Sequence, residues 1–153
     1  MKSLKIWSLV ALLAMALVGC GNDDDNGGKA PATNSNIVGK WHLASWCGEA
    51  PEFDIYIEFK KDGKFDIYQQ AWIFTYEHFS GAYTLEKGIL SGVYSDGTDW
   101  TARYIVDVVD SKLRLINKVD LEEVSIYEES TIPNEIIEEA KSETRSEGVV
   151  PFL

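Results

Sequence analysis

The stretch Ile55-Tyr56-Ile57-Glu58-Phe59-Lys60-Lys61-Asp62-Gly63-Lys64-Phe65-Asp66-Ile67 decides the fold of this chain. Apolar and polar residues alternate on both sides of a Lys-Asp-Gly turn, which is typical of two antiparallel strands with one buried face. A three-residue loop with Gly63 in the left-handed conformation pairs Phe59 with Phe65. A two-residue turn would instead place Phe59 opposite Asp66 and mix buried with exposed residues. The stretch therefore predicts a β-hairpin whose apolar side chains share one face.

The same texture of short alternating runs and turn signals extends from Ile37 to about Glu129. Eight strands are predicted, at 37–47, 53–60, 64–70, 79–86, 89–95, 98–109, 112–118 and 123–129. Eight is the number at which an up-and-down sheet can close around a side-chain core or one small ligand. We therefore expect an all-β fold, an eight-stranded antiparallel up-and-down β-barrel.

Turn lengths predict which residues face the interior of this barrel, because directly opposed residues lie on one face of a sheet. A Ser95-Asp96-Gly97 loop places Trp100 opposite Gly92, where the indole can cover bare backbone. Two-residue turns at Lys87-Gly88 and Asp110-Ser111 extend the same face. The predicted inward set is Phe53, Ile55, Ile57, Phe59, Phe65, Ile67, Tyr83, Leu85, Leu90, Trp100, Ala102, Tyr104, Val106, Val108, Leu113, Leu115, Val124 and Ile126.

The period changes from two to that of a helix after the last strand. Residues 131–144 carry one apolar stripe, made of Ile132, Ile136, Ile137 and Ala140, and predict a C-terminal amphipathic helix. We expect it to lie on the outside of the barrel over Ile105 and Ile116. Residues 149–153 are too apolar to stay in water, so we expect them to dock, as an added edge strand.

The N-terminus has the pattern of a secretory signal. Residues 1–5 are basic and 6–18 are apolar, too short for a spanning helix of about 20 residues. Leu17-Val18-Gly19-Cys20 resembles the bacterial lipobox, which implies cleavage before Cys20 and lipidation of its sulfur. The expected divisions are a lipoprotein signal peptide at 1–19, a lipidated flexible acidic tether at 20–36, and the barrel with its helix and docked tail at 37–153.

The composition narrows the location and the partners. Asp23-Asp24-Asp25 resembles the surface-export signal of some Gram-negative lipoproteins, although a merely solvated linker fits it too. We expect an outer-membrane lipoprotein on the periplasmic or cell-surface face. The net charge of −11 disfavours nucleic acid. With Cys20 acylated, Cys47 has no disulfide partner, and we expect it to be a small buried residue at a strand end.

Gly39-Lys40-Trp41, on the first strand, resembles the Gly-x-Trp signature of the lipocalins. The resemblance implies that Trp41 closes one end of the barrel and that a helix follows the last strand. The open mouth is then ringed by loops at 47–52, 70–78, 95–99 and 118–123. Together with the lipobox, this layout resembles the short bacterial lipocalin-like lipoproteins.

The candidate ligand site consists of polar or aromatic residues predicted to face inward near the mouth: Ser45, Gln69, Tyr76, Tyr94, Trp100, Tyr104 and Asn117. Small apolar sites with a few convergent hydrogen-bonding groups are typical of ligand pockets. The rim carries Glu49, Glu52, Glu77, Asp96, Asp99, Asp120, Glu122 and Glu123 against Lys118, which favours a neutral or cationic ligand. The competing interpretation is that these rings only fill the barrel.

Enzyme signatures are missing, so no catalytic residue, cofactor or metal site is predicted. His42 and His78 lie far apart in sequence, and no Cys/His spacing resembles a zinc site. Glu77 and His78 near Asp99 form the weakest alternative, an acid-base set. Two functions remain open: binding a small hydrophobic or amphipathic ligand, or a non-enzymatic module that engages an envelope protein or glycan through its rim or an outward-facing Trp46.

Overall fold

The computed structural model describes residues 33–142 and 148–153. Its elements are α1 (Asn34–Ile37), β1 (Gly39–Trp46), β2 (Asp54–Phe59), β3 (Lys64–Gln70), β4 (Glu77–Glu86), β5 (Ile89–Tyr94), β6 (Tyr104–Val109), β7 (Lys112–Asn117), β8 (Val124–Glu129) and α2 (Asn134–Ser142). The predicted signal peptide, Cys20 and most of the predicted tether lie outside the described residues. None of the described helices is long and apolar enough to cross a membrane.

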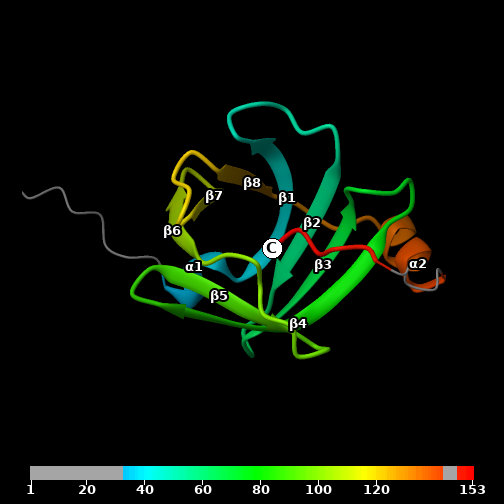
Figure 1. Cartoon of the computed structure of the whole chain (residues 1–153), viewed down its shortest axis with the longest axis horizontal. Helices are drawn as coiled ribbons and strands as arrows, with labels where there is room; N and C mark the ends of the chain where they lie inside the picture. The colour runs from blue at the N-terminus through cyan, green and yellow to red at the C-terminus, as the bar shows by residue number, and fades with distance from the viewer. Residues whose placement is uncertain (1–32, 143–147) are drawn as a thin grey trace, which may run out of the picture.

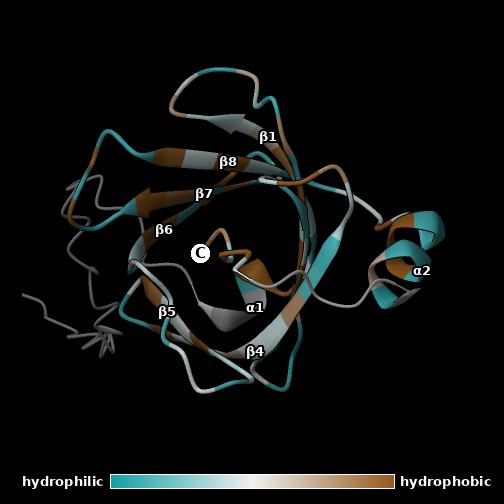
Figure 2. Cartoon of the chain, turned by 45° about the vertical axis from the view of Figure 1, so that its right-hand side comes forward, coloured by the Kyte–Doolittle hydropathy of each residue, from teal (hydrophilic) through white to brown (hydrophobic). Residues whose placement is uncertain are grey.

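The eight strands form a closed antiparallel barrel in which every strand pairs with its sequence neighbours and β1 also pairs with β8 (Figures 1 and 2). The hairpin at Gly63 has the predicted register, with Phe59 opposite Phe65, and Gly63 has a φ of 81°. The predicted pairs Leu85–Leu90 and Val108–Leu113 are also confirmed. The expected fold class is therefore confirmed.

The boundary between β5 and β6 is the shortest in the barrel. Only Ile89–Ile105 and Leu90–Tyr104 pair regularly there, because β6 begins at Tyr104 and not at the predicted residue 98. Residues 98–100 are not part of a regular strand, but Asp99 forms an isolated bridge with Val93, and Trp100 covers Gly92. The Trp100 N–H donates to the Gly92 carbonyl at 2.9 Å, as the predicted pairing requires.

The barrel interior is filled by the predicted apolar face. Sixteen of the eighteen predicted inward residues lie in the main core cluster or pack against it, and Val124 and Ile126 do not. The register of β7 and β8 sets Leu113 opposite Tyr127 and Leu115 opposite Ser125. Tyr127 and Ser125 are consequently the buried residues of β8. The prediction that Val124 and Ile126 face inward was wrong.

The closed end of the barrel lies where α1 meets β1. Trp41 is 5% exposed, and its Nε1 donates a hydrogen bond of 2.7 Å to the carbonyl of the fully buried Ile37. The helix α1 lies across this end of the ring (Figure 2). The last residues of the predicted tether, 34–36, belong to α1, and its final residue, Ile37, accepts this hydrogen bond from Trp41.

The C-terminal helix α2 lies outside the barrel, as predicted, but against a different wall (Figures 1 and 2). Ile132 and Ile136 pack with Tyr56, Tyr68 and Tyr76 on the outer face of β2 to β4. The expected position over Ile105 and Ile116 was wrong. The chain leaves β8 beside β1, where Ser130 N–H donates to the Lys40 carbonyl, so the tyrosine-covered wall is the nearer apolar surface.

Candidate functional site

The mouth of the barrel holds the last residues of the chain, 149–153. The C-terminus lies at the centre of the ring of strands (Figures 1 and 2), and Leu153 is 1% exposed within the main core cluster. The segment enters through the open end and forms no strand, so the expected edge strand was wrong. The barrel has no free edge to extend, and its mouth is the apolar surface that remains.

Gln69 on β3 is the central polar group of the mouth. Its side chain is 1% exposed, and both ends of its carboxamide are used. Nε2 donates to the Val150 carbonyl at 2.9 Å, and Oε1 accepts from the Phe152 N–H at 2.8 Å. Two opposite bonds to main-chain groups two residues apart are how one strand pairs with another. The side chain of Gln69 therefore takes the place of a neighbouring strand.

Two further donors hold the same segment. The Tyr94 hydroxyl donates to the main-chain oxygen of Leu153 at 2.8 Å, and Trp72 Nε1 donates to the Val150 carbonyl at 2.9 Å. Tyr94 is 5% exposed, with its ring edge-on to Phe65 at 5.6 Å. Tyr94 and Gln69, predicted for the ligand site on the strength of facing the mouth, thus converge on one bound segment.

Three aromatic rings, those of Trp46, Phe53 and Trp72, surround this segment at the rim. Phe152 lies 5.5 Å from Phe53 and 6.4 Å from Trp46, and Phe53 lies 6.3 Å from Trp72. Trp46 was predicted to face outward, and this was wrong. A β-bulge between Leu43 and Ser45 inverts the alternation of β1, so that Trp46 turns inward opposite the buried Ser125. Its buried Nε1 has no acceptor among the described residues.

Trp100 and Tyr104 face inward as predicted but lie in the packed interior. The Trp100 ring contacts Phe65 at 5.0 Å and Tyr104 at 6.2 Å, each edge-on. Tyr104 is 3% exposed, and burial, followed by the nearby charge of Glu123, raises the pKa of its hydroxyl. The hydroxyl of Tyr104 is therefore neutral at physiological pH.

Three predicted site residues do not reach the site. Ser45 faces outward because of the same bulge, which places it opposite Ile126. Tyr76 also faces outward, with its hydroxyl bonded to Asp54 and its N–H to Glu139 of α2. Asn117 instead organises the loop before β8: its side-chain oxygen accepts the Val119 N–H, and its nitrogen donates to Glu123. The β-bulge and the local loop geometry therefore decide which way these three side chains point.

The outer wall beneath α2 carries two histidine–aspartate pairs that the sequence did not predict. His42 bonds to Asp54 and stacks on Tyr56, while His78 bonds to Asp66 at 2.6 Å and stacks on Tyr68. The sequence did carry one sign of these pairs, because the two histidines, two aspartates and two tyrosines all occupy outward positions on adjacent strands.

One of these pairs includes His78, a member of the acid-base set considered above. His78 bonds to Asp66, and Asp99 forms an isolated bridge with Val93 of β5. The His78 hydrogen bond, with help from Lys60, holds the pKa of Asp66 below its usual range despite burial. No cluster of three or more metal-ligating side chains occurs in the described residues. Asp66 is only 9% exposed, although it lies on the outer wall.

The acidic rim is present only in part. Glu77 is 3% exposed, because it lies within β4 opposite Gln69, so its predicted place on the rim was wrong. Glu123 is partly buried through its bond to Asn117. Exposed carboxylates remain at Glu49, Glu52, Asp120 and Glu122 on the loops after β1 and β7. The predicted rim positions of Asp96 and Asp99 were wrong, because Ser95 lies beside Lys60 and Lys64 near the β2–β3 turn and Asp99 lines a groove on the outer wall. Cys47 is exposed on the β1–β2 loop, contrary to the expectation of burial, with a φ of 51°.

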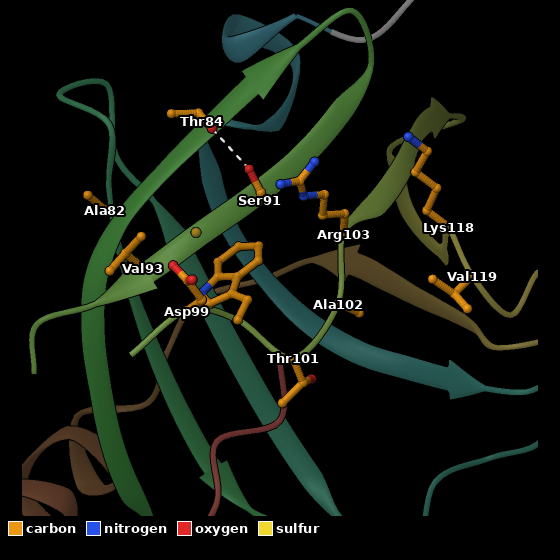
Figure 3. Close-up of a pocket in the computed structure, with 12 residues that line it drawn as sticks. Ala82, Thr84, Ser91, Val93, Asp99, Thr101, Ala102, Arg103, Lys118 and Val119 are labelled. Carbon is orange, nitrogen blue, oxygen red and sulfur yellow. Dashed lines mark hydrogen bonds between the residues drawn. The ribbon is translucent and has the colours of Figure 1, made fainter. Parts of the chain in front are cut away.

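A groove of about 540 Å³ opens on the outer wall at the short β5–β6 boundary (Figure 3). Trp100 and Val93 form its apolar part, and Arg103 and Lys118 stand on the opposite side. The Lys118 N–H donates to the Arg103 carbonyl at 2.8 Å, which joins the loop before β8 to the segment before β6. The groove also includes Val119 of the loop before β8, and it was not predicted from the sequence.

The chain is similar to solved structures and matches one family model. A lipocalin-like protein from Bacteroides uniformis ATCC 8492 is 20% identical, with a TM-score of 0.49 over 62% of this chain and 99% of that one. An uncharacterized protein from Bacteroides eggerthii DSM 20697 is 21% identical, with a TM-score of 0.48 over 61% and 99%. No curated protein matches. The family model described as a lipocalin-like domain matches residues 37–115, just over half of the chain. The chain therefore belongs to the family of lipocalin-like domains.

Proposed function

We propose that this protein is a lipid-anchored binding protein of the cell envelope that holds a small hydrophobic or amphipathic molecule in the mouth of its barrel. The lipocalin-like barrel is a fold compatible with a small hydrophobic ligand. The anchor is the predicted thioether at Cys20, and the predicted tether separates it from the domain.

One observation carries the proposal: the buried Gln69 carboxamide and the Tyr94 hydroxyl converge in an aromatic mouth. Both are nearly inaccessible to water, and both bond to a segment that has no other regular structure. A few fixed polar groups in an apolar concavity give orientation and specificity, while the aromatic rings give affinity. A barrel stabilised by packing alone would have no need of a buried amide at this position.

The charge of the rim selects among such ligands. Glu49, Glu52, Asp120 and Glu122 are exposed on the loops after β1 and β7, and the chain as a whole carries a charge of −11. A negative potential of this kind raises the local concentration of cations and lowers that of anions. The ligand of this site is accordingly neutral or cationic.

The test is a titration of the folded protein with the neutral fluorescent probe N-phenyl-1-naphthylamine, followed by displacement with dodecylamine and with dodecanoate. We expect saturable binding near one probe per chain, and displacement by the amine at a lower concentration than by the carboxylate. Raising the salt concentration should narrow that difference, because exposed charges are screened. Absence of saturable probe binding would contradict the proposal.

A second function is favoured by a separate observation. Phe74 is 97% exposed, Val119 93% and Leu121 62%, and all three lie on loops that ring the mouth. Exposed apolar residues gathered at one end of a molecule mark interaction sites. This end is accordingly a contact for an envelope protein or glycan. A Phe74→Ser, Leu121→Ser protein that keeps probe binding but loses crosslinking to its envelope neighbour would support this function.

A further inference from the structure

We infer that the mouth of the barrel is a site for an extended apolar peptide, and that residues 149–153 are its resident occupant, which a ligand must displace. The inference rests on the proposed mouth site and names the class of ligand that it takes.

The first ground is the way Gln69 contacts the main chain. The Val150 carbonyl and the Phe152 N–H flank Pro151, and both point toward the same carboxamide. In an extended chain these two groups lie on one side, and the N–H of the residue between them points away. Proline, which has no N–H, is tolerated at that central position. Gln69 therefore recognises the peptide backbone, and any extended chain offers the same carbonyl and N–H groups.

The second ground is the division of the segment into buried and exposed side chains. Leu153 is 1% exposed among the core residues, and Phe152 packs against Phe53 and Trp46. Val150 is 55% exposed. The site therefore selects a large aliphatic residue at the deepest position and an aromatic residue before it, and it is indifferent two positions earlier. Backbone bonds for affinity and pockets for side-chain choice are the general arrangement of extended-peptide recognition.

The third ground is that the segment can be replaced. Among the described residues, its hydrogen bonds to the barrel all come from side chains, namely those of Gln69, Trp72 and Tyr94. No strand has to break for it to leave. It also leaves the buried Trp46 Nε1 without an acceptor, a bond that a ligand carrying a carbonyl there would gain. A competing peptide can therefore form the same hydrogen bonds with the barrel that residues 149–153 give up.

Tethering sets the strength of this competition. An attached segment has an effective concentration on the order of millimolar, so a free peptide binds the intact protein only weakly. Its apparent affinity is reduced by the fraction of molecules whose mouth is open. Weakening the resident segment should therefore increase the affinity for the same segment added as a peptide.

The experiment measures the fluorescence anisotropy of a labelled peptide, Gly-Val-Val-Pro-Phe-Leu, with full-length proteins. A Phe152→Asp, Leu153→Asp variant should bind it at least tenfold more tightly than the wild type. In that background Gln69→Leu should lose about tenfold, because two hydrogen bonds are removed. Gln70→Leu is the matched control, since the Gln70 amide bonds to the Phe74 carbonyl and not to the segment. A peptide with Ser in place of Phe and Leu should not bind.

Equal peptide affinity of wild type and double variant would overturn the inference, as would a Gln69→Leu protein no weaker than Gln70→Leu. If the double variant unfolds at low temperature, Phe152→Ala, Leu153→Ala replaces it, with circular dichroism as the check on folding. The neutral probe separates this outcome from the proposed function. Saturable probe binding without peptide binding leaves the function intact and rejects the peptide, and loss of both rejects both.

Discussion

Gly92 owes its importance to the indole that covers it. A methyl group added at Gly92 would lie 2.3 Å from Trp100 Cε2, and that ring is enclosed by Phe65 and Tyr104. We expect Gly92→Ala to lower the free energy of unfolding by about 1–3 kcal/mol, the usual cost of overpacking. Urea denaturation measures it. Trp100→Phe, a smaller ring, should recover part of the loss when combined with Gly92→Ala, and additive losses would contradict the clash.

Asp66 makes the stability of the fold depend on pH. Because its pKa is lowered in the fold, mainly by the His78 hydrogen bond, the native state holds the carboxylate in its charged form. Its contribution is complete above the ordinary value of 3.8 and is lost as the pH falls from there through the lower native value.

We therefore expect Asp66→Asn to be less stable than the wild type at pH 7 and the difference to shrink below about pH 4, the ordinary range of a carboxyl group. Urea midpoints measured between pH 7 and pH 3 provide the comparison. A constant difference across this range would mean that Asp66 acts through packing and not through its charge. Asp62→Asn, at an exposed turn position, is the control and should change little.

Single residues were predictable wherever alternation held without interruption. Ile57, Phe59 and Phe65 face inward as their spacing indicates. The alternation fails on β1, where the inward side chains are those of Trp41, Leu43 and then Trp46. An apolar spacing of three at the end of a strand was the available sign of a bulge. Reading it would have placed Trp46 in the mouth and Ser45 outside.

At the level of elements, α2 shows what periodicity leaves undecided. Its apolar stripe predicts a helix packed on the barrel, and Ile136 is buried as that requires. The stripe does not say which wall it covers. Tyr56, Tyr68 and Tyr76 form an outward aromatic surface across three neighbouring strand regions, which offers more contact area than two isoleucines.

The position of α2 can be tested by truncating its contact. Ile136→Ala should destabilise the protein by about 2 kcal/mol, since it leaves a cavity beside Tyr56. Ile116→Ala, on the wall that α2 does not cover, should cost less because Ile116 is already partly exposed. Thermal unfolding of the two variants decides this, and the reverse order would place the helix over β6 and β7.

For the whole molecule, barrel closure follows from a chain of hairpins that can be counted in the sequence. The place of residues 149–153 does not, because five residues carry no period and their position depends on the shape of an assembled mouth. Their hydrophobicity shows that they dock. Only the folded barrel, with Gln69 and Tyr94 brought together from β3 and β5, shows where.

The proposed anchor belongs to the same scale, since it decides where the whole domain acts. Cys20→Ala should move the protein from the membrane fraction to the soluble fraction, because two or three acyl chains hold a protein stably and none remain in the variant. Cell fractionation with antibody detection measures the shift. A Cys20→Ala protein that still sediments with membranes would show that another part of the chain binds there.

The short β5–β6 boundary has a consequence for how this protein fails. Two regular residue pairs and the isolated Val93–Asp99 bridge hold that boundary, whereas six regular pairs hold each of its neighbours, β4–β5 and β6–β7. A barrel that opens there becomes a curved sheet with two bare edges, and one of them carries Ile89, Leu90 and Val93. Bare apolar edges join other chains and begin aggregates. In concentrated or heated samples, self-association should therefore start from the opened wall, before the rest of the barrel has unfolded.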